Sequence, residues 1–136
     1  MEEPDEATRV MKETITLKPI GIFFCNTNKD MGLSAHCHYA EVQITFQTIG
    51  DIGFPSFHDT FEEVKNFVQG LKLKPFKGTN EMVARYIWNQ LLDFDFPATQ
   101  KYGGDFEAHS MTLNVMGLRD ENNHADGFTT YKIQAN

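Results

Sequence analysis

Two histidines separated by a single residue, His36 and His38, have the spacing in this chain that is best suited to hold a metal ion. Side chains at positions i and i+2 of an extended segment point to the same face, so both imidazoles can reach one ion. Imidazole nitrogen is a common zinc ligand. Cys25 is the only soft ligand upstream of the pair and is the expected third ligand. The alternative is two ordinary surface histidines and a Cys25 that acts as a small buried apolar residue.

A second polar pair, Glu107 and His109, has the same spacing at the start of an expected strand. The two side chains can therefore share a face. An imidazole in such a place is a candidate for proton transfer, and a carboxylate is a candidate for ligand binding. Outside a site, each is an ordinary polar side chain.

The elements that must position these residues are indicated by the apolar pattern. Residues 39–48 alternate between apolar and polar side chains, which predicts a strand with one buried face. Apolar residues recur at helical spacing in 59–71 and again in 79–91. Thr79 or Asn80 can cap the second helix, because a side-chain oxygen satisfies the first free N–H groups of a helix.

The remaining segments complete a mixed α+β domain. Further strands are expected at 13–24, 110–116 and 128–133, with an irregular loop at 94–104. Pro19 inside the first of these favours an edge strand or a bulge, because proline has no N–H to donate. The order ββ–αα–ββ predicts a four-stranded antiparallel sheet with both helices on one face.

Length and composition limit the class of protein. The 136 residues suit one domain, expected at 13–136 after a solvated N-terminal tail at 1–12. The formal net charge of −7, without a lysine and arginine cluster, argues against nucleic-acid binding.

The sequence lacks recognisable targeting signals and has only two cysteines, which together predict a cytoplasmic protein. No apolar run approaches the roughly 20 residues that span a membrane. The acidic start, Met1 to Glu6, lacks the basic and apolar parts of a signal peptide. The two cysteines, Cys25 and Cys37, allow at most one bridge, so a disulfide framework is not expected.

Three segments together resemble one enzyme family. The run T-N-E-M-V-A-R-Y-I-W at 79–88, in the second expected helix, carries the most specific match, since its residue identities exceed what helical periodicity requires. His36-Cys37-His38-Tyr39 is similar to a family motif H-G-H-N-Y, and 119–123 followed by 129–132 is similar to E-T-D-N-N and a V-V-Y-K strand. The family is that of the 6-pyruvoyl-tetrahydropterin synthases, which includes the bacterial 6-carboxytetrahydropterin synthases.

This resemblance implies a fold, a reaction and an assembly. The family fold is the T-fold, in which ββ–αα–ββ subunits join their sheet edges into a β-barrel. A homo-oligomer is implied, a trimer-based hexamer or a tetramer, with active sites between subunits. The implied activity is that of a zinc-dependent lyase, which eliminates triphosphate from dihydroneopterin triphosphate or a related pterin. The two histidines of the H-x-H motif bind zinc in the family, together with a third histidine from the preceding strand.

Several residues that the family uses are replaced here. No histidine precedes His36, and 29–35 holds no cysteine for the catalytic position. In an alternative alignment, Leu33 to His36 is similar to the family's F-S-A-x-H, which would remove the H-x-H motif. The segment 71–74, Leu-Lys-Leu-Lys, stands where the family has an L-D-H signature, and lysine is a poor base at neutral pH.

The pterin-binding position is also altered. Arg119 stands where a glutamate accepts hydrogen bonds from the pterin, and a guanidinium only donates. Glu121 can take over after a small shift, and Glu107 is a second candidate for substrate binding. Glu121 and His109 are the candidate catalytic residues. The sequence therefore predicts a pterin synthase-like protein with a degenerate site. The alternatives are a non-catalytic or re-purposed T-fold oligomer that binds a small ligand or serves a structural role, and an unrelated α+β domain.

Overall fold

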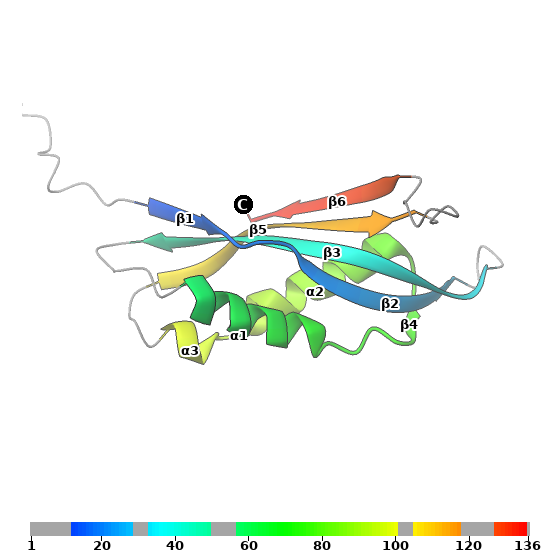
Figure 1. Ribbon diagram of the computed structural model, residues 1–136, viewed down its shortest axis with the longest axis horizontal. Coiled ribbons are helices and arrows are strands. Elements are labelled where there is room, and N and C mark those ends of the chain that lie inside the picture. The colour runs from blue at the N-terminus through cyan, green and yellow to red at the C-terminus, as the bar shows by residue number, and fades with distance from the viewer. Residues whose placement is uncertain (1–11, 29–32, 50–56, 101–104, 118–126, 136) are drawn as a thin grey trace, which may run out of the picture.

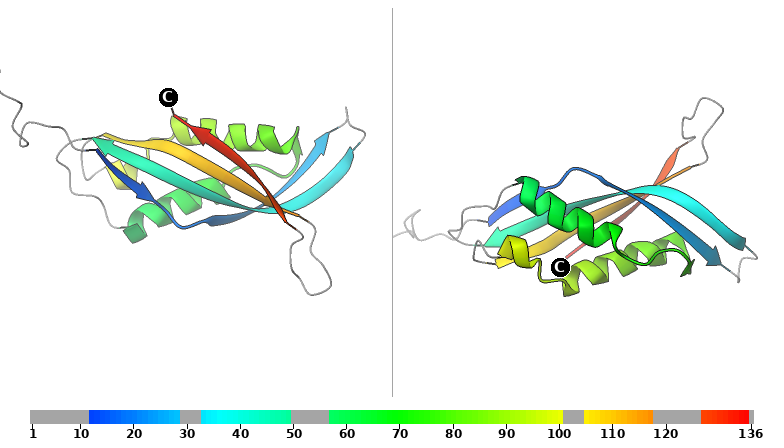
Figure 2. Two further views of the ribbon diagram at one scale, coloured as in Figure 1. Left: turned by 90° about the horizontal axis from the view of Figure 1, so that it is seen from above. Right: turned by 60° about the horizontal axis from the view of Figure 1, so that its bottom comes forward.

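A computed structural model describes residues 12–28, 33–49, 57–100, 105–117 and 127–135. One curved sheet forms a layer, and two helices cover one of its faces (Figure 1). Figure 2 shows both helices across the same face of the twisted sheet. The ββ–αα–ββ order of the expected α+β class is confirmed. Most of the expected N-terminal tail lies outside the described residues. Among those described, no helix has the length and apolar character needed to cross a membrane.

Within the described residues the sheet has six strands instead of the four that were predicted, in the order β4-β2-β3-β5-β6, with β1 pairing β3. The bounds are β1 Lys12–Thr16, β2 Ile20–Asn28, β3 Leu33–Ile49, β4 Phe76–Lys77, β5 Asp105–Met116 and β6 Phe128–Gln134. The neighbours of β3 and β5 are all antiparallel, as predicted, while the two-residue β4 runs parallel to β2.

The additional strands have local causes. β1 and β2 lie end to end along the same side of β3, because both pair with it. The break between them contains Pro19. The Leu17 N–H still donates to the Ile44 carbonyl across that break, at 3.0 Å. β3 begins at Leu33, earlier than the predicted 39, so both histidines of the H-x-H motif lie inside a strand.

The helices are α1 Phe57–Gln69, α2 Asn80–Asp93 and the short α3 Pro97–Gln100. Thr79 caps α2 as predicted, and its hydroxyl accepts from the Met82 N–H at 3.2 Å. α3 lies within the segment that was predicted to be an irregular loop. α3 is stabilised by a residue of another helix. The Glu63 carboxylate of α1 accepts hydrogen bonds from the Ala98 N–H at 2.8 Å, and from the Thr99 N–H and hydroxyl at 3.0 and 2.7 Å.

The core lies between the sheet and the two long helices. Alternate residues of β3 are buried against the helices, as the sequence predicted, and so are alternate residues of β5 beyond its bulge: Ala40, Val42, Ile44, Phe46, Met111, Leu113 and Val115. Aromatic rings fill the end of the core near α3, where the rings of Phe46 and Phe106 stack with centroids 4.6 Å apart. The other sheet face carries polar side chains such as Gln43 and Thr112.

We expect Glu63→Ala to lower the free energy of unfolding by about 1–3 kcal/mol, because three hydrogen bonds to one carboxylate are lost. Glu62→Ala is the matched control. It removes only a half-exposed pair with Lys65 and should change stability by about 0.5 kcal/mol or less. Urea unfolding measures both. Equal losses in the two variants would contradict this role of Glu63.

Candidate functional site

The H-x-H motif lies at the end of the β2–β3 hairpin, on the face of the sheet that the helices cover. His38 belongs to the same alternating series as the buried Ala40 and Val42, and it is half-buried with its ring 5.3 Å from that of Phe24 on β2. His36 occupies the preceding position of that series and pairs in register with Asn26. The strand backbone therefore brings both histidine positions to one face.

Asn26 is a buried polar residue that the sequence did not single out. It is 3% exposed, and its Nδ2 donates to the Gly78 carbonyl at 3.0 Å and to Asn80 Oδ1 at 2.9 Å. These bonds join β2 to the first residue of α2. The Asn26 Oδ1 is buried and has no hydrogen-bond partner. A buried polar atom in that state is costly, by about 1–3 kcal/mol, so it marks a place where a ligand would be stabilising.

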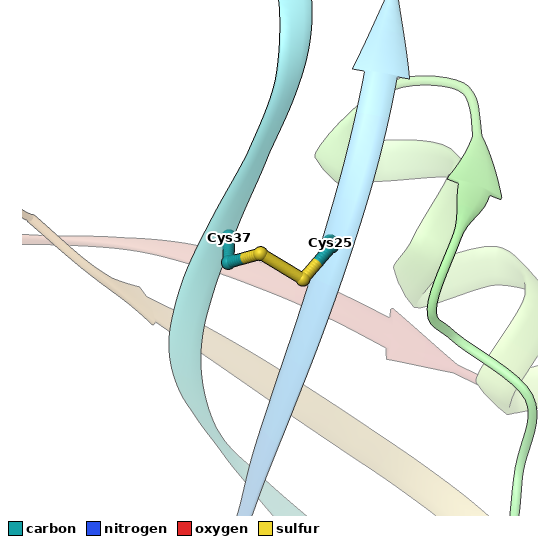
Figure 3. Close-up of a disulfide and its surroundings, with 2 residues drawn as sticks. All are labelled: Cys25 and Cys37. Atoms are coloured by element: carbon teal, nitrogen blue, oxygen red, sulfur yellow. A yellow bond between two sulfur atoms is a disulfide. The ribbon is translucent and has the colours of Figure 1, made fainter.

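The expectation that Cys25 is a third metal ligand is corrected by the structure. Its Sγ is bonded to that of Cys37, as Figure 3 shows, so it is not a thiolate. Cys37 lies between the two histidines in β3, and side chains of successive strand residues point to opposite faces. The bridge therefore lies on the open face of the sheet, and a reduced Cys25 would also point away from the histidine face.

The donor set fits a zinc site only in part. Zinc in proteins is held by imidazole, thiolate and carboxylate groups, in most structural sites by four of them. The described residues contain no group of three or more His, Cys, Asp or Glu that could hold a metal ion. Two histidine positions and one amide oxygen, that of Asn26, do not complete such a site. Zinc binding stays a prediction, and we derive no chemical step from it.

The other candidates do not gather at the histidines. His109 is the extra residue of a bulge in β5, because Thr45 pairs with Ser110 and Phe46 with Ala108. Phe46 lies about 26 Å along β3 from His38, at about 3.3 Å per residue. Glu107 pairs with Gln47, farther still. Within one subunit, neither side chain can share a site with His38.

Glu121, with Arg119, lies outside the described residues. The residues that flank this segment are Gly117 and Gly127, whose N–H and carbonyl are 2.7 Å apart. Val115, two residues before Gly117, pairs with Ala40, which is two residues from His38. The described ends of this loop are therefore near the histidine end of the sheet, unlike His109 and Glu107.

Of three comparisons with known proteins, the one with solved structures gives matches. No family model matches the chain, and the search of curated proteins gives no match either. The solved structures that resemble it include a 6-pyruvoyl tetrahydropterin synthase from Plasmodium vivax, at 12% identity and a TM-score of 0.48, over 93% of this chain and 99% of that one. Two catalytic-residue mutants of that enzyme align with the same values.

We expect the bridge between Cys25 and Cys37 to stabilise the hairpin end of the sheet. It closes a loop with a sequence separation of 12, which corresponds to about 3 kcal/mol of unfolding free energy. The variant Cys25→Ser/Cys37→Ser should be less stable than the oxidised wild type by about that amount in urea unfolding. Adding a reductant should weaken the wild type and leave the variant unchanged. A wild type that is insensitive to reductant would contradict the bridge.

Proposed function

We propose that this chain is a divergent 6-pyruvoyl-tetrahydropterin synthase-like protein that binds a pterin-like small molecule. One observation carries the proposal. Two of the three segments with the family resemblance, His36-Cys37-His38 and the start of α2, come together through Asn26, which pairs with His36 and donates to Asn80. These two segments thus meet at the buried side chain of Asn26.

The activity that we propose is lyase chemistry on dihydroneopterin triphosphate or a related pterin, carried out by a degenerate site. The degeneracy is supported by three features. Cys25 is held in a bridge. The lysines of 71–74 replace the proton relay. His109 lies far along the sheet from His38 within one subunit. Glu121 remains the candidate acceptor for the pterin and Glu107 a weaker one.

The alternative is a non-catalytic or re-purposed oligomer of the same fold. The outer strands of the sheet favour assembly, because exposed strand edges are templates for pairing with another chain. Phe23 on β2 is 61% exposed and Phe128 on β6 is 66% exposed. Both readings share the homo-oligomer, either a trimer-based hexamer or a tetramer. The bridge between Cys25 and Cys37 argues against the reducing cytoplasm that the sequence predicted. They differ in whether the ligand is turned over.

We expect triphosphate release from dihydroneopterin triphosphate to be slower than about 1 per second, the lower end of ordinary enzyme turnover. Loss of single catalytic groups commonly lowers the rate by factors of about 100 to 10,000. The assay should use metal-loaded protein. A rate at or above that value would show that the site is intact and that the residue matches above are wrong. Binding of the pterin without turnover would favour the alternative.

We expect zinc, if the protein retains it after purification without a histidine tag, to depend on the H-x-H pair. His36→Ala/His38→Ala should lower the zinc content measured by elemental analysis to background. His58→Ala is the matched control, since His58 is an exposed imidazole on α1, away from the hairpin. Cys25→Ser/Cys37→Ser should leave the zinc content unchanged. Zinc content that survives the double histidine variant would contradict the site.

A further inference from the structure

The bridge between Cys25 and Cys37 joins two residues that lie directly opposite each other on β2 and β3 (Figure 3). The Cys25 N–H donates to the Leu73 carbonyl at 3.1 Å, so the backbone groups of Cys25 point away from β3. In an antiparallel pair such a position alternates with hydrogen-bonded pairs, which here come immediately before and after it. These neighbouring pairs keep the two cysteines opposite each other whether or not their sulfurs are bonded. The bridge can therefore open and close without a change of register.

The bridge is also accessible in the folded protein. It lies on the open face of the sheet, away from the helices, where Cys37 is exposed and Cys25 is partly exposed. Thiol–disulfide exchange begins when a thiolate attacks one of the sulfurs, and its rate depends on access to that sulfur. A reductant can therefore reach this bridge while the helices remain packed on the other face.

The part of β3 next to the bridge has few other restraints. Toward the turn of the hairpin, Asn26 pairs with His36, and the register then shifts before Asn28 pairs with Leu33. On its other side, β3 pairs with β5 only from Ala40 onward. Within the described residues, 33–39 of β3 are thus paired on one side only, and the bridge is the covalent restraint on that pairing.

The end of β2 is held more firmly than the end of β3. The Asn26 side chain donates to the Gly78 carbonyl at 3.0 Å and to Asn80 Oδ1 at 2.9 Å, and β4 pairs with the same end of β2. Opening the bridge should therefore leave β2 in place. It should let residues 33–39, which include His36 and His38, separate from β2 more often, while the paired arrangement remains the main one.

We propose that the bridge between Cys25 and Cys37 is a reversible redox switch, which a dithiol reductant opens and which controls how often residues 33–39 separate from β2. A thiolate of the reductant attacks one sulfur and forms a mixed disulfide, and the other cysteine leaves as a thiolate that takes a proton from water. The second thiol of the reductant loses its proton and attacks the mixed disulfide, which releases the remaining cysteine to be protonated in turn. Two electrons and two protons thus pass to the bridge, and the reductant becomes a disulfide. The switch goes beyond the proposed function, since it operates whether or not the histidine face binds a pterin.

Reduction of the oxidised wild type by dithiothreitol without denaturant, followed by thiol alkylation and mass measurement, tests the opening step. We expect both cysteines to be alkylated, at a rate proportional to the reductant concentration. Glu63→Ala is the control for unfolding, because it removes the hydrogen bonds to α3, at the other end of the sheet (Figure 1). Exchange in the folded protein should proceed in this variant at the wild-type rate. Exchange that requires unfolding would be about 5 to 30 times faster in it, because the unfolded fraction rises by such a factor.

Amide hydrogen exchange tests the consequence of opening. Reduction should speed exchange in 33–39 by about tenfold or more, because local separation limits exchange there. It should leave 110–116 of β5 unchanged. Cys25→Ser/Cys37→Ser should show the faster exchange with and without reductant. Oxidised glutathione, added after the reductant is removed, should restore the slow exchange of the wild type only.

Three results would overturn the switch. They are a bridge that dithiothreitol cannot open until urea unfolds the protein, faster reduction in Glu63→Ala, and unchanged exchange in 33–39 after reduction. Neither measurement uses a pterin or a metal ion, so failure of the pterin proposal and failure of this one are distinguishable.

Discussion

The pairing of β3 with three other strands is the constraint on which the rest of this structure depends. β1 and β2 pair along one side of its 17 residues, and β5 pairs along the other. Because side chains alternate along a strand, a single register decides which residues face the helices and which face outward. Val42, Ile44 and Phe46 fix that register, since a slip by one residue would expose all three. The H-x-H motif takes its orientation from this apolar run and not from its own chemistry.

The same alternation places His38 and the disulfide on opposite faces of the sheet at the end of the β2–β3 hairpin. His38 lies in the series that faces the helices, while Cys37, its neighbour in the chain, forms the bridge on the open face. Residues adjacent in sequence are thus on opposite sides of the sheet. Asn26 continues the inward series on β2 and connects it to the start of α2 through Asn80 and Gly78. This connection encloses the corner on which the functional proposal rests.

A different constraint acts at the edge of β2, where the sheet has to satisfy the hydrogen bonds of its outermost backbone groups. Backbone groups at an edge need partners, and here they obtain them from several sources: Leu73 on the chain before β4, the Gln69 side chain and β4 itself. Where this cover is interrupted, the edge opens into a hollow lined by Lys72 and Lys74. Lys72 and Lys74 thus lie where the cover of this edge is interrupted.

The sequence by itself determined the elements whose signals are local. Four features were predictable because each depends on neighbours within a few residues. They are the alternation at 39–48, the two amphipathic helices, the Thr79 cap and the break at Pro19 between β1 and β2. The α+β class with antiparallel strands followed from their order. Three features depended on tertiary structure: the start of β3 at Leu33, the short α3 held by Glu63, and β4. α3 and β4 are stabilised by partners distant in the chain, while the start of β3 is decided by its pairing with the end of β2 across the hairpin.

The candidate site was decided almost entirely by the tertiary structure. The spacing of His36 and His38 predicted a shared face, but the ligand Cys25 was wrong, because strand register and not sequence proximity determines which side chains meet. Asn26 carried no sequence signal, since its importance comes from burial and from an acceptor on a helix 54 residues away. Glu107 and His109 were separated from the histidines by the length of β3. Local pattern fixes what each segment is, while pairing register and burial fix which of its side chains can act together.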